Sequence, residues 1–324
     1  MKRKIIKQGH NTLTMTLPSK WAEKFNIKAG DEIDLVEQGK DLKITTEKGN
    51  TESERVVVDI SGQMVTMVWR MVSSAYRAGY DEIKIVFENK SFKDLYTAFT
   101  YDTIYALNSI QGLSALEAIQ SLVNRFVGFE IIEQKSNYVI IKDLGETTGK
   151  EFENTLRRIF LLLLTMADAI MGSLKGKKDE LKAFHMIDTN LDRFEDFCLR
   201  ILNKQGYSDF KKTHIMFTLI FLIEMVGDEY KKMGLHILKL NKMSPGLKEF
   251  IILVDSMVRD FYDLYYNFSK EKAAELYKKD AEGYNLFDKV WPKSSADEKE
   301  LIHHLKKVGK LVYSLTELRI DLAY

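Results

Sequence analysis

Residues 8–18 read QGHNTLTMTLP, and this stretch indicates how the chain begins to fold. After the Gly-His-Asn turn signal, threonine alternates with leucine and methionine from Thr12 to Leu17, and Pro18 ends the run. Alternation with a period of two predicts a β-strand that has one apolar face and one hydroxyl-bearing face. The chain therefore begins with a strand beside a turn, although helical patterns dominate its second half.

The residues that follow predict a small unit of strands and turns. We expect a short helix over Ser19–Lys28, a strand over Ile33–Val36 and a last strand over Leu42–Thr45. Glycine turns separate these elements, and a polar linker, EKGNTESE, follows them. About fifty residues with three short strands are near the size at which a core of their own becomes marginal, so pairing with a second copy is physically reasonable.

Charge is distributed unevenly along the chain. The 324 residues have a formal net charge of +1, but residues 1–30 hold seven basic residues against Glu23 alone, so this segment carries +6 and the remainder −5. A basic binding site must therefore be local. A two-fold dimer would double the basic patch and match a palindromic duplex. The alternative is an edge-strand domain whose lysines only keep it soluble.

The composition excludes several classes of protein. A single cysteine, Cys198, excludes an internal disulfide framework and multi-cysteine zinc sites, and it favours a cytoplasmic protein. The basic start lacks the apolar core of a signal peptide, and the longest apolar run, Ile159–Met171, is too short to cross a bilayer, so we expect no membrane insertion. Phosphate-binding glycine loops, GxSxG and HExxH are absent from the sequence, so we expect no enzyme.

Two further parts follow the linker and differ in periodicity. Residues 52–147 mix both patterns and predict a small α+β domain, with strands over Val56–Ile60 and Ile83–Phe87, helical stretches over residues 64–78, 95–107 and 115–125, and a hairpin over residues 129–143. Residues 149–324 show six helical segments and no strand pattern, which predicts an all-α bundle or two three-helix bundles end to end. The expected fold class is therefore a multidomain α+β protein.

The order of elements over residues 2–45 resembles the swapped-hairpin DNA-binding domain of the AbrB/MazE/SpoVT family. A strand, a Gly-x-Asn turn, a strand ending in proline, a short helix, a Gly-Asp turn and a final hairpin carry this resemblance. It implies that two chains exchange hairpins to form one β-barrel, in which lysines neutralise phosphates and the turn approaches base edges. By position, it implies DNA contacts by Arg3, Lys4, Lys7, His10, Asn11 and Lys20. Family members often carry an arginine where this chain has Thr16.

A stripe of carboxylates is the second notable pattern. Asp188, Asp192 and Asp196 repeat every four residues on one predicted helix, and Glu224 and Asp228 repeat this spacing on the next. Like charges at this spacing repel by about 0.2–0.5 kcal/mol per pair, and a cation would reverse the sign. Facing carboxylates on two helices supply the oxygen ligands of divalent or trivalent metals. The alternative is a solvated acidic face.

These carboxylates also resemble a repeat of the PhoU family. DTNLDRFEDFCLRIL and the later LIEMVGDEYKKMG are similar to that family's paired E(D)xxxD motifs, which hold metal ions. The resemblance implies two three-helix repeats, 149–243 and 244–324, and a site for a divalent or trivalent metal ion (iron, zinc or magnesium) formed by Asp188, Asp192, Glu224 and Asp228. The second repeat has Lys306 and Lys310 in place of the carboxylates, and Tyr284 four residues after Asp280, so we expect one site rather than two.

The three parts, 1–50, 52–147 and 149–324, follow the order of an archaeal-type phosphate uptake regulator. This resemblance implies a homodimeric, DNA-binding transcriptional regulator of phosphate uptake, with a palindromic operator and phosphate transporter components as partners. Two alternatives stay open. One is an adaptor that binds a phosphate transporter or a kinase without contacting DNA, and the other is an antitoxin-like autorepressor.

Overall fold

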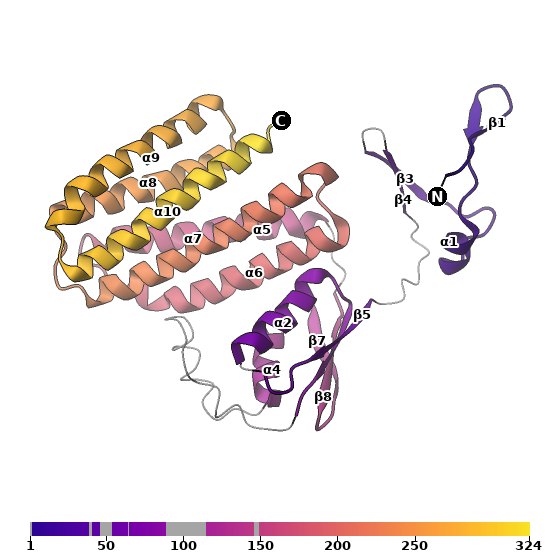
Figure 1. The fold of residues 1–324 in the computed structure, drawn as a ribbon, viewed down its shortest axis with the longest axis horizontal. Helices are drawn as coiled ribbons and strands as arrows, with labels where there is room; N and C mark the ends of the chain where they lie inside the picture. The colour runs from indigo at the N-terminus through magenta and orange to yellow at the C-terminus, as the bar shows by residue number, and fades with distance from the viewer. Residues whose placement is uncertain (1, 39–40, 46–53, 64, 89–114, 146–148) are drawn as a thin grey trace. The chain divides into compact units, whose positions relative to one another are not determined.

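The computed structural model describes residues 2–38, 41–45, 54–63, 65–88, 115–145 and 149–324. The chain divides into two compact units, Met1–Glu54 and Arg55–Tyr324. The first unit is small and contains short strands, and the second combines a four-stranded sheet with long helices (Figure 1). The predicted helical stretch over 95–107 and most of the predicted linker lie outside the described residues. The chain is therefore a mixed α+β protein whose C-terminal part is mostly helical.

The first unit consists of two hairpins joined by a short helix. Strands β1 (Ile6–Gln8) and β2 (Thr12–Thr14) pair antiparallel, as do β3 (Asp34–Gln38) and β4 (Asp41–Thr45), and α1 covers Ser19–Lys24. The alternating segment is thus a strand, as predicted, although it pairs only as far as Thr14.

The predicted helix Ser19–Lys28 is too long at its C-terminal end. Helix α1 ends at Lys24, and Asn26 adopts a left-handed conformation with a φ of +49°. The Ile27 N–H then donates to the Ala22 carbonyl at 2.8 Å. Asparagine tolerates this conformation better than most residues, and such a residue commonly ends a helix. The local chemistry of one asparagine therefore stops the helix a turn early.

The partner strand mixes polar and apolar residues on each face of the first hairpin. Ile6 lies opposite Thr14, and Lys7 lies opposite Leu13. Directly opposed residues of an antiparallel pair share a face, so each face of the hairpin carries one polar and one apolar member of these pairs. Alternation along one strand shows which of its residues share a face. It does not show which residues the partner strand adds to that face, and here the partner places an apolar residue beside Thr14 and a polar one beside Leu13.

The second unit begins with a four-stranded sheet covered by two helices. The strand order is β5 (Arg55–Asp59), β6 (Glu82–Val86), β8 (Tyr138–Asp143) and β7 (Phe129–Gln134). Strands β5 and β6 are parallel, and the other pairs are antiparallel. Helices α2 (Val65–Ala78) and α4 (Ala115–Val123) pack on one face of the sheet (Figure 1) and share its hydrophobic core. The strands and the hairpin predicted for this region are therefore present.

Six long helices form the rest of the unit, as the sequence predicts. They are α5 (Gly149–Ser173), α6 (Phe184–Gln205), α7 (Thr213–Lys239), α8 (Pro245–Tyr266), α9 (Lys270–Val290) and α10 (Ala296–Asp321). Ser244 caps α8 ahead of Pro245, and Ser295 with Glu298 forms the predicted capping box of α10. In the described part of the chain, no helix is both long and apolar enough to cross a membrane.

The helices share one continuous hydrophobic core. Its buried residues come from α5, α6 and α7 and also from α8, α9 and α10, and α10 packs along α7 while α8 contacts α5 (Figure 1). Two separate three-helix bundles placed end to end are therefore not what the structure shows. The two groups of three helices lie side by side, and α7 and α10 form the main contact between them.

Candidate functional site

The first hairpin presents its turn and its basic side chains to solvent. Gly9 has a φ of +74°, a conformation that glycine adopts without strain, and it begins the turn that places His10 and Asn11 at the tip. The six residues predicted to contact DNA are all exposed: Arg3, Lys4, Lys7, His10, Asn11 and Lys20. Arg3 and Lys4 precede β1, Lys7 lies within it, and Lys20 lies on α1.

These basic side chains are available to a ligand. Within the described residues, Arg3, Lys4, Lys7 and Lys20 form no ion pair. A lysine or arginine that already pairs with a carboxylate would have to exchange that partner for a phosphate, whereas an unpaired one exchanges only water and counterions. The hairpin can therefore meet a polyanion without disrupting its own contacts.

The first unit has no interior of its own. None of its residues whose side chains the structure describes is buried. Large apolar side chains are instead exposed: Ile5, Ile6, Leu13, Met15, Leu35 and Leu42. Leu13, for example, is 68% exposed. Apolar surface gathered on so small a unit is typical of a segment that buries it against a partner.

The predicted carboxylate stripe lies on α6, facing α7 and the sheet domain. The close approach of α6 and α7 depends on Gly227, where a Cβ atom would lie 2.7 Å from Cδ1 of the buried Leu191. This packing brings Asp188 and Asp192 of α6 near Glu224 and Asp228 of α7, close enough that charges of the other carboxylates contribute to a raised pKa of Asp188 and of Glu224. Six acidic groups gather here, which we call the acidic cluster: Asp188, Asp192, Glu195, Asp196, Glu224 and Asp228.

Three side chains of the protein neutralise part of the acidic cluster. Lys231 donates to Asp188 at 2.6 Å and to Asp228 at 2.9 Å. Arg125, from the sheet domain, donates to Asp192 at 2.7 Å, and Arg77 of α2 donates to Asp196 at 2.9 Å. Lysine and arginine side chains therefore supply at least part of the positive charge that offsets the repulsion between these carboxylates.

Two glutamates in the cluster favour the protonated form. Burial, reinforced by the charge of Asp196, raises the pKa of Glu195 to about 8. Burial and the neighbouring carboxylates, Asp228 first among them, raise the pKa of Glu224 to about 10. Desolvation disfavours a charged carboxylate, and nearby like charges add to this effect. The cluster therefore holds protons at neutral pH that isolated glutamates would release.

The residues predicted to bind metal have carboxylate oxygens of the type that a metal ion binds, but these oxygens are not close enough together to coordinate one. Two buried carboxylate oxygens of the cluster, Asp188 Oδ1 and Glu195 Oε1, have no hydrogen-bond partner. Among the described residues, however, the carboxylates of Asp188, Asp192, Glu224 and Asp228 do not bring three ligand atoms within 4.8 Å of one another. A metal ion bound by Asp188 and Asp228 would also have to displace Lys231.

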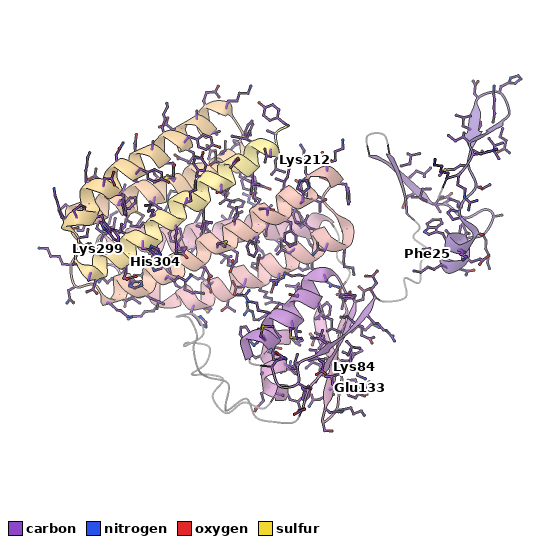
Figure 2. The ribbon with its side chains drawn as sticks, viewed as in Figure 1. Phe25, Lys84, Glu133, Lys212, Lys299 and His304 are labelled. Carbon is purple, nitrogen blue, oxygen red and sulfur yellow. The ribbon has the colours of Figure 1, made fainter. Side chains whose placement is uncertain are left out.

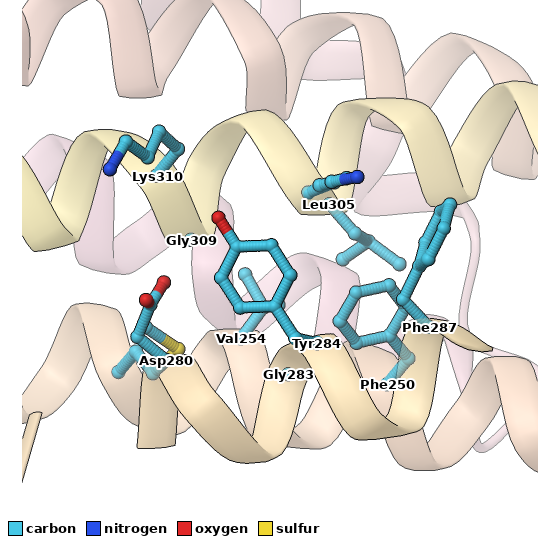
Figure 3. A pocket seen from close by; sticks show the side chains of 11 residues that line it. Phe250, Val254, Asp280, Gly283, Tyr284, Phe287, Leu305, Gly309 and Lys310 are labelled. Carbon is cyan, nitrogen blue, oxygen red and sulfur yellow. The ribbon is translucent and has the colours of Figure 1, made fainter. Parts of the chain in front are cut away.

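The corresponding positions of the second group of helices line a cavity instead. Asp280 and Tyr284 of α9 and Lys306 and Lys310 of α10 border a space of about 90 Å³ floored by Phe250 of α8 and its neighbours (Figure 3). Lys306 lies 4.1 Å from the Phe287 ring centroid, and Lys310 lies 4.0 Å from that of Tyr313. These lysines contact aromatic rings, as cations commonly do.

The sequence analysis did not predict the three basic partners of the acidic cluster, nor its member Glu195. Lys231 follows Asp228 by three residues, a spacing that places the two side chains together on a helix. Glu195 falls three residues after Asp192 and is equally accessible to a helical pattern. Arg77 and Arg125 carry no such signal, because they are separated from their partners by 119 and 67 residues.

Comparison with known proteins gives a family match for the first unit and a similar solved structure. Residues 6–52 match the family model of MazE, described as a bacterial antitoxin of antidote-toxin recognition. The solved structure of the phosphate transport system regulatory protein PhoU from Streptococcus pneumoniae is similar over 54% of this chain and 95% of that one, with 18% sequence identity and a TM-score of 0.44. No curated protein matches significantly. MazE and PhoU belong to the two families that the sequence resembles.

Proposed function

We propose that this chain is a cytoplasmic, homodimeric regulator that binds operator DNA through its first hairpin and controls phosphate uptake. The observation that carries the proposal is the character of the first unit, in which exposed apolar residues accompany basic side chains that form no ion pair with any described residue. The match of residues 6–52 to MazE supports a regulatory role. The proposal assigns no catalytic activity.

Dimerisation by exchange of hairpins follows from the exposed apolar residues. In a swapped dimer, Leu13 and Leu35 would leave water, and burying such a side chain contributes about 1.5–3 kcal/mol. Two copies would also place two sets of basic residues on one surface related by a two-fold axis, which suits a palindromic site. The wild-type protein should have twice the chain mass of 37.6 kDa in light scattering, and Leu13→Asp should lower it towards one chain mass.

DNA binding is divided between two kinds of residue. Arg3, Lys4, Lys7 and Lys20 contact phosphates and supply affinity that depends on salt. His10 and Asn11, at the tip of the turn, approach base edges and contribute specificity. Thr16 lies where related proteins often carry arginine, so the turn and the first strand carry most of the interaction.

A salt titration tests this division. Affinity for a promoter fragment should fall linearly as salt rises on logarithmic axes, and Lys7→Ala should reduce the slope by about one for each phosphate that Lys7 neutralises. Lys28→Ala is the matched control, because Lys28 is an exposed lysine of the same unit outside the proposed contacts, and it should leave the slope unchanged. A slope near zero for the wild-type dimer would favour the adaptor that binds a phosphate transporter or a kinase without contacting DNA.

We further propose that Asp188, Asp192, Glu224 and Asp228 hold a divalent or trivalent metal ion. The partnerless oxygen of Asp188 and the mutual repulsion of the carboxylates support this proposal, and the pairing of Asp188 with Lys231 opposes it. Elemental analysis after purification in metal-supplemented medium is the test. The Glu224→Gln/Asp228→Asn double variant should lose the ion, and an unchanged metal content would exclude this site.

The antitoxin-like autorepressor is a second candidate, and the match of residues 6–52 to the MazE antitoxin family favours it. In this role the first unit would repress its own operon, and the remainder of the chain would block a toxin. A toxin encoded beside the gene and recovered with the purified protein would support this role. A phosphate transporter operon in that place would support the regulator of phosphate uptake.

A further inference from the structure

A group of metal-binding side chains lies where α7 and α10 pack together, apart from the acidic cluster. His236 is in the last turn of α7, and Glu300 and His304 are four residues apart on α10, so they share one side of that helix. One ligand atom from each of the three lies within 4.8 Å of the other two. Two helices that belong to different halves of the bundle therefore direct two imidazoles and one carboxylate towards a common point.

His304 is held in an orientation suited to binding a metal ion. Its Nδ1 atom lies 2.6 Å from Oε2 of the buried Glu229, and only 8% of His304 is exposed (Figure 2 marks its position). When Nδ1–H donates to a carboxylate, the lone pair resides on Nε2, at the other side of the ring. A carboxylate that fixes the tautomer and raises the basicity of the ring in this way accompanies metal-binding histidines in many proteins.

The surroundings give the site a protected floor and an open entrance. His236 is half-buried, and its ring centroid lies 5.2 Å from that of His304, whereas Glu300 is exposed. An ion can therefore enter from solvent on the side of Glu300, whose side chain is able to rotate inward. Ligands of zinc lie about 2.0–2.2 Å from the metal, so the three ligand atoms need to approach one another by only about 1–1.5 Å.

We infer that His236, Glu300 and His304 form a binding site for a divalent transition-metal ion, with zinc as the best match. Two imidazole nitrogens and one carboxylate oxygen are a zinc-binding set that leaves a fourth position for water or another ligand. Glu229 is the positioning residue that orients His304. The bound ion ties α7 to α10, so it stabilises the contact between the two halves of the bundle. This zinc site is independent of DNA binding.

The inference is tested by titrating the full-length, metal-free protein with Zn²⁺. Titration calorimetry measures the binding, and scanning calorimetry measures the unfolding temperature. The wild-type protein should bind Zn²⁺ at this site, and its unfolding temperature should rise with the concentration of the ion, because a ligand that binds the folded state stabilises it. Glu300→Ala and His236→Ala should each weaken binding at least tenfold. Both residues are exposed or half-buried, so these variants should fold.

Two controls separate this site from other histidines and from the acidic cluster. His303→Ala removes the adjacent exposed histidine, and the Glu224→Gln/Asp228→Asn variant removes two carboxylates of the acidic cluster. His303→Ala should leave all Zn²⁺ binding unchanged. The Glu224→Gln/Asp228→Asn variant should keep the binding that Glu300→Ala loses and should remove only an ion held by the acidic cluster. With Co²⁺ as the probe, the wild-type protein and these controls should give the intense visible absorption of a four-coordinate site.

Three results would overturn the inference. They are the absence of Zn²⁺ binding to the wild-type protein at submillimolar concentrations, an equal loss in His303→Ala, and undiminished binding in both Glu300→Ala and His236→Ala. Glu229→Gln adds a measurement of positioning, since it keeps the three ligands. It should weaken Zn²⁺ binding by about 10–100-fold, as loss of such a supporting carboxylate does.

Discussion

Helices α7 and α10 each contain a Val-Gly pair. Acidic residues flank the pair in α7, and basic residues flank it in α10. In α7, Glu224 and Asp228 flank this pair, whereas in α10 the flanking residues are Lys306 and Lys310. A Cβ atom on Gly227 would lie 2.7 Å from Leu191, but one on Gly309 would meet only Met257, at 4.0 Å. Helix α7 is therefore pressed against its neighbour, and α10 leaves room for a cavity.

The charges beside each glycine are compensated in different ways. Carboxylates of α6 and α7 repel one another, so arginines of the sheet domain and Lys231 compensate part of their charge. Lysines of α10 lie over aromatic rings of α9 and α10 and do not depend on another domain. One helical framework therefore supports either a charge-dense contact or an apolar cavity, according to which residues flank the shared Val-Gly pair.

The largest expected effect comes from removing the cation that joins α6 to α7. Lys231→Met leaves the buried Asp188 without its ion pair, which should lower the free energy of unfolding by about 3 kcal/mol at neutral pH. Lys310→Met is the matched change in α10. It removes a contact with the Tyr313 ring and a charge that acts on Asp280, but Lys310 is exposed to solvent, so the free energy of unfolding should fall by less than about 1 kcal/mol. Urea denaturation in the presence of a chelator measures both, and equal losses would remove the proposed difference between the helices.

The acidic cluster should make the stability of the protein depend on pH. Because burial and Asp196 raise the pKa of Glu195 to about 8, the folded protein keeps a proton that the unfolded chain releases above about pH 4.5. The contribution of Glu195 to stability therefore falls as the pH rises from about 4.5 to 8. Glutamine stays neutral, so Glu195→Gln should match the wild type near pH 5 and exceed it by about 2 kcal/mol at pH 8.5.

The control for this pH dependence is Glu282→Gln, which changes an exposed glutamate of α9. The free energy of unfolding of Glu282→Gln should differ from that of the wild type by the same amount at pH 5 and at pH 8.5. Urea midpoints measured at pH 5 and pH 8.5 with a chelator present give the comparison. A constant difference for Glu195→Gln as well would show that Glu195 is ionised in the folded protein at both pH values.

The two glycines should respond to the same substitution with opposite sign. Gly227→Ala places a methyl group against Leu191, which is buried and cannot move freely, and should lower the free energy of unfolding by about 1–3 kcal/mol. Gly309→Ala makes only an ordinary contact with Met257 and replaces glycine by a better helix former, so it should raise the free energy of unfolding by up to about 1 kcal/mol. Thermal unfolding of the two variants checks the signs, and destabilisation of equal size in both would contradict the difference in packing.

Much of the fold was predictable because its signals are local. Ser244 before Pro245, and Ser295 three residues before Glu298, mark the starts of α8 and α10 through hydrogen bonds within a single turn. The end of α1 was misplaced because a left-handed Asn26 is permitted, not required, by its sequence. The sequence left one bundle and two end-to-end bundles open, since the pairing of α7 with α10 that decides between them depends on contacts between distant helices.

The candidate sites were predictable only in part, for the same reason. The spacing of Asp188, Asp192 and Asp196 correctly indicated one helical stripe, but their partners Arg77 and Arg125 come from another domain. His236 lies 68 positions from His304, so no spacing rule connects them.

The smallest expected effect concerns the cavity beside α10. Gly283 lies within α9 and borders the cavity, and a Cβ atom there would lie 3.9 Å from Phe250 and 4.0 Å from Leu253, which is ordinary contact. Gly283→Ala should therefore raise the free energy of unfolding by about 0.5–1 kcal/mol, because alanine favours the helix and adds contacts to the cavity wall. Urea denaturation measures this gain. If Gly283→Ala instead destabilises the protein as Gly227→Ala does, the space beside α10 is filled, and the two helix pairs do not differ in packing.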